Sequence, residues 1–182
     1  MNLNNFTIKA QEAIQRAQEL AMSHEQQAIE PAHILKGMLT EEENVVGHLL
    51  KKFNANVDHV KSQLDEMVEN LPKVSGSGQQ FLSNAANQVV QQAFKAVKDF
   101  GDEYVSVEHL LIGILKGNDK TARLLKDQGL NDNDLKKAIE DLRGGSKVTD
   151  PSAEEKYNAL EKYAKNLNEF ARSGKLDPVI GR

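Results

Sequence analysis

The stretch Ile29-Glu-Pro-Ala-His-Ile-Leu-Lys-Gly-Met-Leu39 returns 76 residues later as Val105-Ser-Val-Glu-His-Leu-Leu-Ile-Gly-Ile-Leu115. The two copies share a histidine (His33 and His109), a glycine, and the apolar pairs that follow each of these residues. A repeat of this length with only two copies does not suit a solenoid, because solenoids need three or more stacked units to bury a continuous core. The sequence therefore predicts two similar units related by a pseudo-twofold axis.

An apolar stripe precedes each copy of the motif. Its members recur at spacings of three and four, which predicts a helix with one buried face. The stripe is Ala10, Ala13, Ile14, Ala17, Leu20 and Ala21 in the first unit, and Ala86, Val89, Val90, Ala93, Ala96 and Val97 in the second. We therefore predict an all-α fold of eight helices, four to a unit: about 7–23, one beginning near 30, 44–53, 58–68, 83–100, 106–117, 119–128 and 132–143.

Composition narrows the class of protein. The net charge is −4 with both signs interspersed, which argues against a nucleic-acid partner, because such a surface would show a basic cluster. The absence of cysteine excludes disulfides and thiol chemistry. No apolar run approaches the roughly 20 residues of a membrane span, and the first residues lack the basic start and apolar core of a signal peptide. We expect no membrane partner and a cytoplasmic location.

Glycine, proline and serine mark the expected boundaries within the chain. A stretch without periodicity separates the two units and predicts a flexible joint. Two consecutive glycines are expected to end the eighth helix, and a new apolar helical pattern begins some residues later. The predicted organisation is unit one at 1–70, a joint at 71–80, unit two at 81–143, the end of the globular domain at 145, a flexible linker at 146–152, and a further segment with a helical stretch at 153–182.

Two features together resemble the amino-terminal part of the Clp family of AAA+ unfoldases. One is the doubled four-helix unit with Ile-Glu-Pro-Ala-His-Ile-Leu at 29–35; the other is Gly-Lys-Leu-Asp-Pro-Val-Ile-Gly-Arg at 174–182, which looks like the start of a first nucleotide-binding domain. The segment from Arg143 through Val148, Glu154 and Tyr157 is most similar to the ClpB-type disaggregases of this family.

The resemblance implies a mobile domain that recognises unfolded or aggregated client proteins above a hexameric, ATP-driven ring. It also implies that ATP, magnesium, the hexamer and an Hsp70-type co-chaperone belong to the full-length protein, and that residues 153–182 are the truncated start of its first nucleotide-binding domain. The fragment itself is expected to be monomeric. The alternative within the family is an adaptor-docking domain of a protease-coupled unfoldase of the ClpC or ClpA type.

No group of residues predicts catalysis or cofactor binding in this chain. The phosphate-binding pattern Gly-x-x-x-x-Gly-Lys-Ser/Thr is absent, and the glycine cluster at 75–78 lacks the lysine that would contact phosphates. The histidines lack the spacing of a metal site, and the duplicated His33 and His109 are expected to have a structural role. Residues 41–43, three consecutive glutamates, predict a solvated turn. The alternative function class, a small α-helical enzyme, is therefore supported by no residues of the sequence.

Comparison of the two units points to residues that the shared fold does not require. Phe94 stands where unit one has Gln18, and Tyr104 stands where it has Ala28. Exposed apolar groups confined to one unit would suit apolar stretches of a client. Phe100 in place of His24, and Ile112 in place of Lys36, are weaker candidates of the same kind.

The resemblance implies three further client-binding residues, Thr7, Asp102 and Glu108. Each also has a structural explanation. Thr7 is a plausible helix N-cap, as is Ser83 in unit two. Glu108 lies in the first turn of a helix, where a negative charge is favourable, and Asp102 follows Gly101 in a turn. The predicted client-binding set is therefore Thr7, Asp102, Glu108, Phe94 and Tyr104, with no catalytic, cofactor-binding or metal-binding residue.

Overall fold

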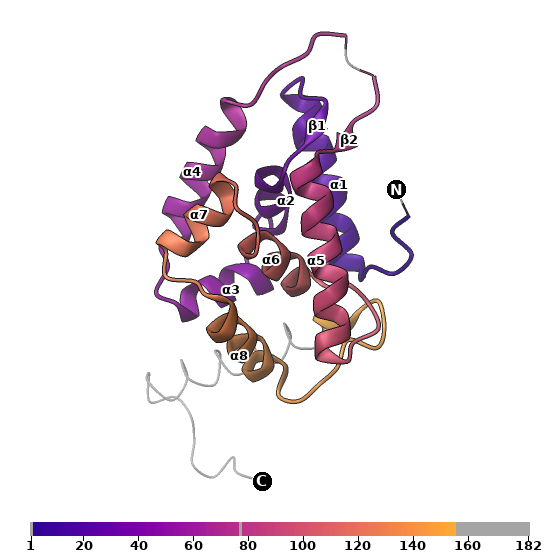
Figure 1. The fold of residues 1–182 in the computed structure, drawn as a ribbon, viewed down its shortest axis with the longest axis vertical. Coiled ribbons are helices and arrows are strands. Elements are labelled where there is room, and N and C mark those ends of the chain that lie inside the picture. The colour runs from indigo at the N-terminus through magenta and orange to yellow at the C-terminus, as the bar shows by residue number, and fades with distance from the viewer. Residues whose placement is uncertain (1, 77, 156–182) are drawn as a thin grey trace, which may run out of the picture.

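The computed structural model describes residues 2–76 and 78–155, and the expected tail beyond 155 lies outside this part of the chain. The described residues form an all-α domain, which confirms the predicted fold class (Figure 1). Its helices are α1 (Ile8–Ser23), α2 (Pro31–Met38), α3 (Val45–Lys52), α4 (Val57–Glu69), α5 (Asn84–Phe100), α6 (Val107–Leu115), α7 (Lys120–Asp127) and α8 (Asp132–Arg143). Two short strands, β1 (Ala28–Ile29) and β2 (Phe81–Leu82), complete the fold. No helix of this part is long and apolar enough to cross a membrane.

Side-chain caps explain where most of the helices begin. At α1 and α5 the hydroxyls of Thr7 and Ser83 accept the backbone N–H three residues on, from Ala10 and Ala86, each at 3.1 Å. These bonds satisfy N–H groups that have no partner inside a helix. Asn44, Asn56, Asp119 and Asn131 cap α3, α4, α7 and α8 in the same way.

The repeated histidine caps the second helix of each unit from inside its first turn. The Nδ1 atom of His33 accepts the backbone N–H of Glu30 at 2.9 Å, and Nδ1 of His109 accepts that of Ser106 at 2.8 Å. Both histidines are fully buried. Their predicted structural role is therefore the capping of α2 and α6.

The two units exchange short extended segments, which the sequence did not predict. Strand β2 of unit two pairs in parallel with β1 of unit one, and Phe6 of unit one forms a parallel bridge with Val105 of unit two. The N–H of Thr7 donates to the Val105 carbonyl (2.9 Å), and that of Ser83 donates to the Ile29 carbonyl (3.0 Å). Each unit thus supplies the chain that precedes its first helix to the other unit, and the two share one core.

Helix α6 lies at the centre of the domain, and all nine of its residues are buried (Figure 1). It packs against α1, α2, α3, α5, α7 and α8. The repeated glycine permits the closest of these approaches, because a Cβ on Gly113 would overlap the carbonyl of Val89 in α5. In unit one, a Cβ on Gly37 would lie 2.6 Å from the carbonyl of Ala13 in α1. The motif therefore combines a capping histidine with a glycine at a helix crossing.

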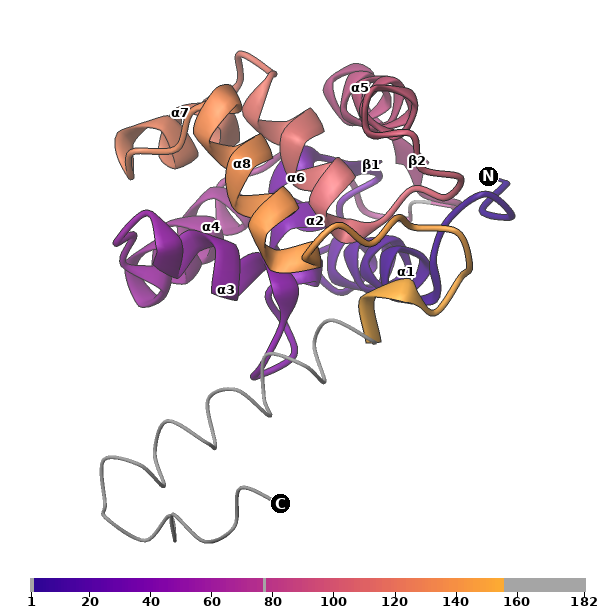
Figure 2. The same cartoon turned by 90° about the horizontal axis from the view of Figure 1, so that it is seen from below.

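The chain after α8, where a flexible linker is predicted at 146–152, makes contacts with the rest of the domain. It runs from the end of α8 across to the start of α1, as Figure 2 shows. Val148 and Glu154 are fully buried, and the carbonyl of Pro151 accepts the N–H of Ile8 at 2.8 Å. The linker at 146–152 stays a prediction; the sequence did not indicate these contacts because single buried residues in a polar stretch make no periodic pattern. The joint at 71–80 also contacts unit one, because the N–H of Val74 donates to the Glu25 carbonyl at 2.8 Å and Nε2 of Gln26 donates to the Leu71 carbonyl at 3.5 Å.

Candidate functional site

A buried group of charged side chains lies where α6 begins and α8 ends. Nε of Arg143 donates to Oε2 of Glu108 at 3.0 Å, and its Nη1 donates to Oδ2 of Asp102 at 2.8 Å. The same Asp102 oxygen lies 2.7 Å from Nε2 of His109. The side chains of both acids are fully buried, and that of Arg143 nearly so. Buried charges must be paired and hydrogen-bonded to be tolerated, and this arrangement meets that requirement.

Asp102 is the electrostatic centre of this group. Burial alone would raise the pKa of Asp102, but hydrogen bonds from His109, from the Val148 backbone and from Arg143 outweigh burial and lower this pKa to about 2. The guanidinium of Arg143 also lies over the ring of Phe100, 5.0 Å from its centroid. Asp102 is therefore ionised at neutral pH.

Glu154 approaches the same end of α6 from the segment after α8. Its Oε2 atom accepts the backbone N–H of Val107, the first residue of the helix, at 2.8 Å. Burial raises the pKa of Glu154 to about 8, and the nearby charge of Glu108 adds to the rise, while the Thr7 hydroxyl and the Val107 N–H oppose it. The carboxyl group of Glu154 is therefore held largely protonated at neutral pH.

The structure brings the three polar site residues of the predicted set together but buries them. Thr7 and Glu154 are neighbours, Glu154 is close to Glu108, and Arg143 joins Glu108 to Asp102. The side chains of Thr7, Glu108 and Asp102 are in contact with the rest of the domain and expose no surface to a ligand. Their role as client contacts stays a prediction, and it requires the covering segment to move.

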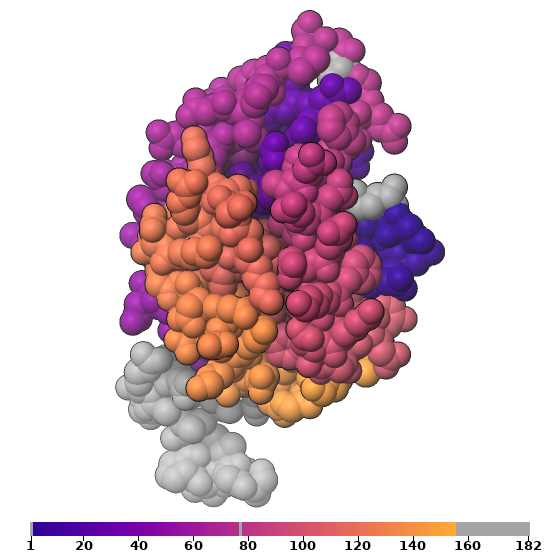
Figure 3. All heavy atoms as spheres, viewed as in Figure 1, coloured from indigo at the N-terminus to yellow at the C-terminus, as the bar shows by residue number. Residues whose placement is uncertain are grey.

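The two aromatic site residues lie elsewhere and are accessible to different extents. Phe94, on α5, is 37% exposed and rests edge-on against the ring of Phe6, with centroids 5.8 Å apart. Tyr104 is half-buried and packs against the core. Two further apolar side chains are exposed near these elements, Phe81 of β2 at 54% and Ile8 at the start of α1 at 43%. In Figure 3, α5 forms an open ridge on the face toward the viewer.

Two weaker candidates of the unit comparison face the interior. Phe100 is buried under Arg143 and lies edge-on to His109, 5.9 Å between centroids. Ile112 is fully buried because α6 is surrounded by other helices, whereas Lys36, the one residue of α2 that is not buried, forms an ion pair with Asp65. Both replacements serve packing, so the expectation that they offer surface to a client was wrong.

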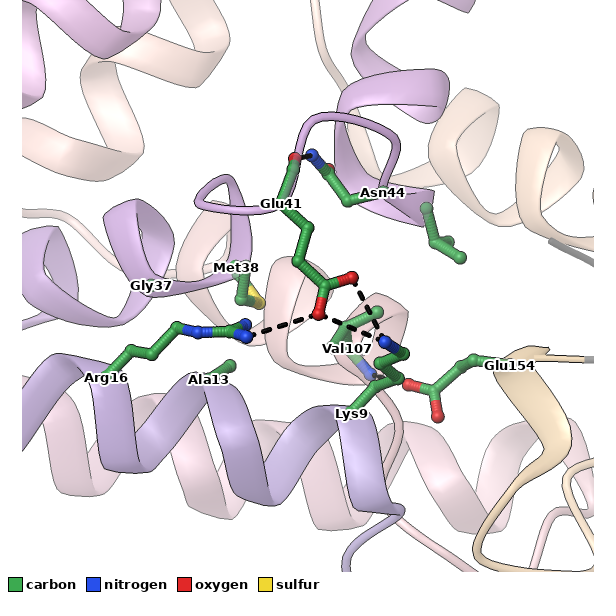
Figure 4. Close-up of a pocket in the computed structure, with 10 residues that line it drawn as sticks. Lys9, Ala13, Arg16, Gly37, Met38, Glu41, Asn44, Val107 and Glu154 are labelled. Atoms are coloured by element: carbon green, nitrogen blue, oxygen red, sulfur yellow. Dashed lines mark hydrogen bonds and ion pairs between the residues drawn. The ribbon is translucent and has the colours of Figure 1, made fainter.

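A shallow pocket adjoins the charged group (Figure 4). Lys9 and Arg16 of α1 reach across it to the carboxylate of Glu41, at 3.0 and 3.2 Å. Glu154 and Val107 form its opposite wall. The predicted solvated turn at 41–43 is therefore anchored at Glu41. Within 2–76 and 78–155, no three His, Asp or Glu side chains are placed to hold a metal ion.

Arg143 and Glu154 were missed as members of the site, although a signal for Arg143 existed. At an offset of 75 residues Arg143 corresponds to Val68, whose carbonyl binds the side chain of Gln26. Gln26 in turn corresponds to Asp102 at an offset of 76. Glu108 likewise replaces Ala32. Unit two therefore has charged residues at three positions where unit one has uncharged ones, and these three positions lie together in the folded domain. Glu154 has no counterpart in unit one, so the comparison could not reveal it.

The fold consists of a duplicated four-helix unit whose two copies exchange short segments and share a capping histidine and a glycine at a helix crossing. These features define the class of α-helical double-repeat domains. The chain matches the family model described as the Clp repeat (R) N-terminal domain over residues 5–128. It therefore belongs to that family.

Relatives and solved structures agree with this assignment. The chain is 52% identical to the chaperone protein ClpB of Bacteroides thetaiotaomicron and 50% identical to that of Porphyromonas gingivalis, in each case over 100% of this chain and 21% of the relative. It thus spans about a fifth of the length of these relatives. The crystal structure of the Hsp104 N-terminal domain from Candida albicans has a TM-score of 0.72 at 22% identity and covers 83% of this chain and 99% of that chain. The predicted similarity to ClpB-type proteins is confirmed.

Proposed function

We propose that this domain recognises unfolded or aggregated client proteins for an ATP-dependent disaggregase. The observation that carries the proposal is the exposed apolar surface at the start of α1, where Phe94 of unit two rests against Phe6 and Ile8 follows two residues later. Exposed aromatic groups of this kind bind apolar stretches that a folded protein hides and an unfolded one displays. Tyr104 adds contact area beside them.

In this proposal the chain binds the client, and the remainder of the full-length protein would use ATP to move it. ATP and magnesium would bind in the nucleotide-binding domains of a hexameric ring in the cytoplasm, which would thread the captured client and act with an Hsp70-type co-chaperone. A domain tethered to such a ring raises the local concentration of client at the pore, so weak and reversible binding suffices. The similarity to ClpB proteins supports client recognition over adaptor docking.

The test is a chemical-shift titration of the chain with a permanently unfolded model polypeptide. We expect shifts around Phe94 and Ile8, and at least a fivefold weaker affinity for Phe94→Ser. The matched control is Met22→Ser, which removes an apolar side chain of similar size that is 57% exposed at the far end of α1. Equal affinities of Phe94→Ser, Met22→Ser and the unchanged chain would contradict the proposal.

A further inference from the structure

The segment 147–154, called the strap below, is bound to both units by its backbone and by the side chains of Lys147 and Glu154; Nζ of Lys147 donates to the Phe100 carbonyl at 2.6 Å. The Glu103 N–H donates to the Val148 carbonyl (2.8 Å), and the Val148 N–H donates to Oδ1 of Asp102 (3.0 Å). Further along, the Pro151 carbonyl accepts the Ile8 N–H (2.8 Å). Together with Glu154 at the start of α6, these contacts hold a segment that runs without regular structure to 149, bends at Asp150 and turns into a helix at Ala153.

Two of the backbone N–H groups that donate to the strap lie at the starts of helices. Ile8 and Val107 are the first residues of α1 and α6, and N–H groups at these positions have no partner within their helices. The same helix ends carry partial positive charge, which favours the carbonyl and carboxyl oxygens that reach them. The strap therefore acts as a ligand for two helix starts, one from each unit.

Few side chains of the strap are buried. Only Val148 and Ala153 bury apolar side chains, while the residues between them are partly or fully exposed. The carboxyl group of Glu154 is buried beside that of Glu108, and its Oε1 atom makes no hydrogen bond within 2–76 and 78–155. A segment with few apolar contacts and an incompletely satisfied polar group opens more readily than the core around it.

Lifting the strap would uncover the polar residues beneath it. Thr7, the pocket wall at Val107 and the carboxylate of Asp102 would reach solvent next to Lys9 of the adjoining pocket. Figure 4 shows Glu154 at the edge of this pocket, on the segment that would leave. The vacated contacts would fit a segment with an apolar side chain in the place of Val148, a turn after it, and a carboxyl side chain six residues later.

We infer that the strap is an internal ligand that competes with the client, and that a client segment of this pattern takes its contacts with the starts of α1 and α6. The inference rests on the proposed function and adds a polar subsite to the exposed apolar one. It also accounts for the burial of Thr7, Asp102 and Glu108 in this structure, because the strap covers them until a client displaces it.

The first experiment measures strap opening without any ligand. Amide hydrogen exchange of the full chain should show the N–H groups of Ile8, Glu103 and Val107 exchanging together, at least tenfold faster than that of Leu111 in the middle of α6. Exchange of all four at one common rate would mean that the strap opens only on global unfolding, and would overturn the inference.

The second experiment measures competition on a released chain. Val148→Asp places a charge in the buried anchor, and its matched control Thr149→Asp places the same charge on an exposed neighbour. A synthetic peptide of residues 146–155 should bind Val148→Asp, shifting the Ile8, Glu103 and Val107 amides, and should bind Thr149→Asp and the unchanged chain at least tenfold more weakly. If Val148→Asp loses helicity, Glu154→Lys with Glu155→Lys as its control takes its place.

The outcomes separate the inference from the proposed function. Displacement of the peptide from Val148→Asp by the unfolded model polypeptide supports the inference. Failure of the peptide to bind the released chain overturns it. Binding of the polypeptide without displacement of the peptide also overturns it, but leaves the proposed function standing. If the polypeptide binds neither the unchanged nor the released chain, the proposed function fails and the inference fails with it.

Discussion

Gln26 and Asp102 occupy the same place in the two units, and each lies 2.7 Å from Nε2 of the histidine seven residues later. Because Nδ1 of His33 and of His109 accepts a backbone N–H, the ring proton is on Nε2 and is donated to Gln26 or Asp102. Unit one thus completes the contact with a neutral amide, and unit two with a carboxylate. The extra charge of Asp102 is stable in the interior because Arg143 pairs with it.

Replacing Arg143 by methionine should destabilise the domain by about 3–5 kcal/mol, because Glu108 and Asp102 would lose the cation that compensates their burial. Urea denaturation followed by circular dichroism measures the free energy of unfolding. Arg123, an exposed arginine of α7, provides the control, and Arg123→Met should change stability by less than about 0.5 kcal/mol. A loss below about 1 kcal/mol for Arg143→Met would show that the buried pairs contribute little.

Converting the whole charged group to its unit-one counterparts should restore most of that loss. The triple variant Asp102→Gln, Glu108→Ala and Arg143→Val removes both acids together with the cation, so no unpaired charge remains in the core. Replacing a complete buried ion-pair group by uncharged residues is often neutral or stabilising, so we expect a free energy of unfolding within about 2 kcal/mol of the unchanged chain. Strict additivity of the three single losses would contradict the close coupling of these residues.

The crossing glycines should not tolerate a methyl group. In Gly113→Ala the new Cβ would overlap the Val89 carbonyl, and backbone atoms cannot move aside as the end of a side chain can. The expected loss of about 1–3 kcal/mol from overpacking exceeds the gain of up to about 1 kcal/mol that alanine brings to a helix. Gly37→Ala should behave in the same way, and Gly78→Ala, with open space around it, should be neutral. Thermal unfolding of the three variants provides the comparison.

The helices could be predicted from the sequence because both copies of the internal repeat carry apolar residues at helical spacing. The exchanged strands could not be predicted, since Phe81 and Leu82 are too few residues to form a pattern and their partners lie in the other unit. The position of Glu108 in a first helical turn explains its negative charge but does not indicate its burial. Only the three-dimensional meeting with Arg143 explains its burial.

His33 should make the domain sensitive to acid. Burial lowers the pKa of His33 to about 4, and the positive charges of His24 and Lys36 add to this effect. Between about 4 and its usual value of 6.5 the unfolded chain binds a proton that the folded chain does not, so stability falls as the pH falls through this window. The free energy of unfolding should drop by up to about 1.4 kcal/mol per pH unit.

The variant His33→Gln should abolish this component of the slope, because glutamine does not titrate in that range. His59→Gln, at an exposed histidine of α4, should keep it. Urea titrations at a series of pH values between 4 and 7 measure the slope for each protein. A slope that is the same in His33→Gln and in the unchanged chain would assign the acid sensitivity to other groups.

Binding of the strap peptide to the released Val148→Asp chain should weaken as the pH rises from about 5 to 8. Burial raises the pKa of Glu154, and the charge of Glu108 raises it further, against the opposing Thr7 hydroxyl. The bound peptide therefore retains a proton that the free peptide loses above about 4.5, and affinity falls as pH rises through that window and levels off above about 8. Asp102 stays ionised throughout.

A peptide with glutamine at the position of Glu154 should bind independently of pH in the same chemical-shift titration. An affinity of the natural peptide that is constant or rises between pH 5 and 8 would show that its carboxyl group binds in the ionised form.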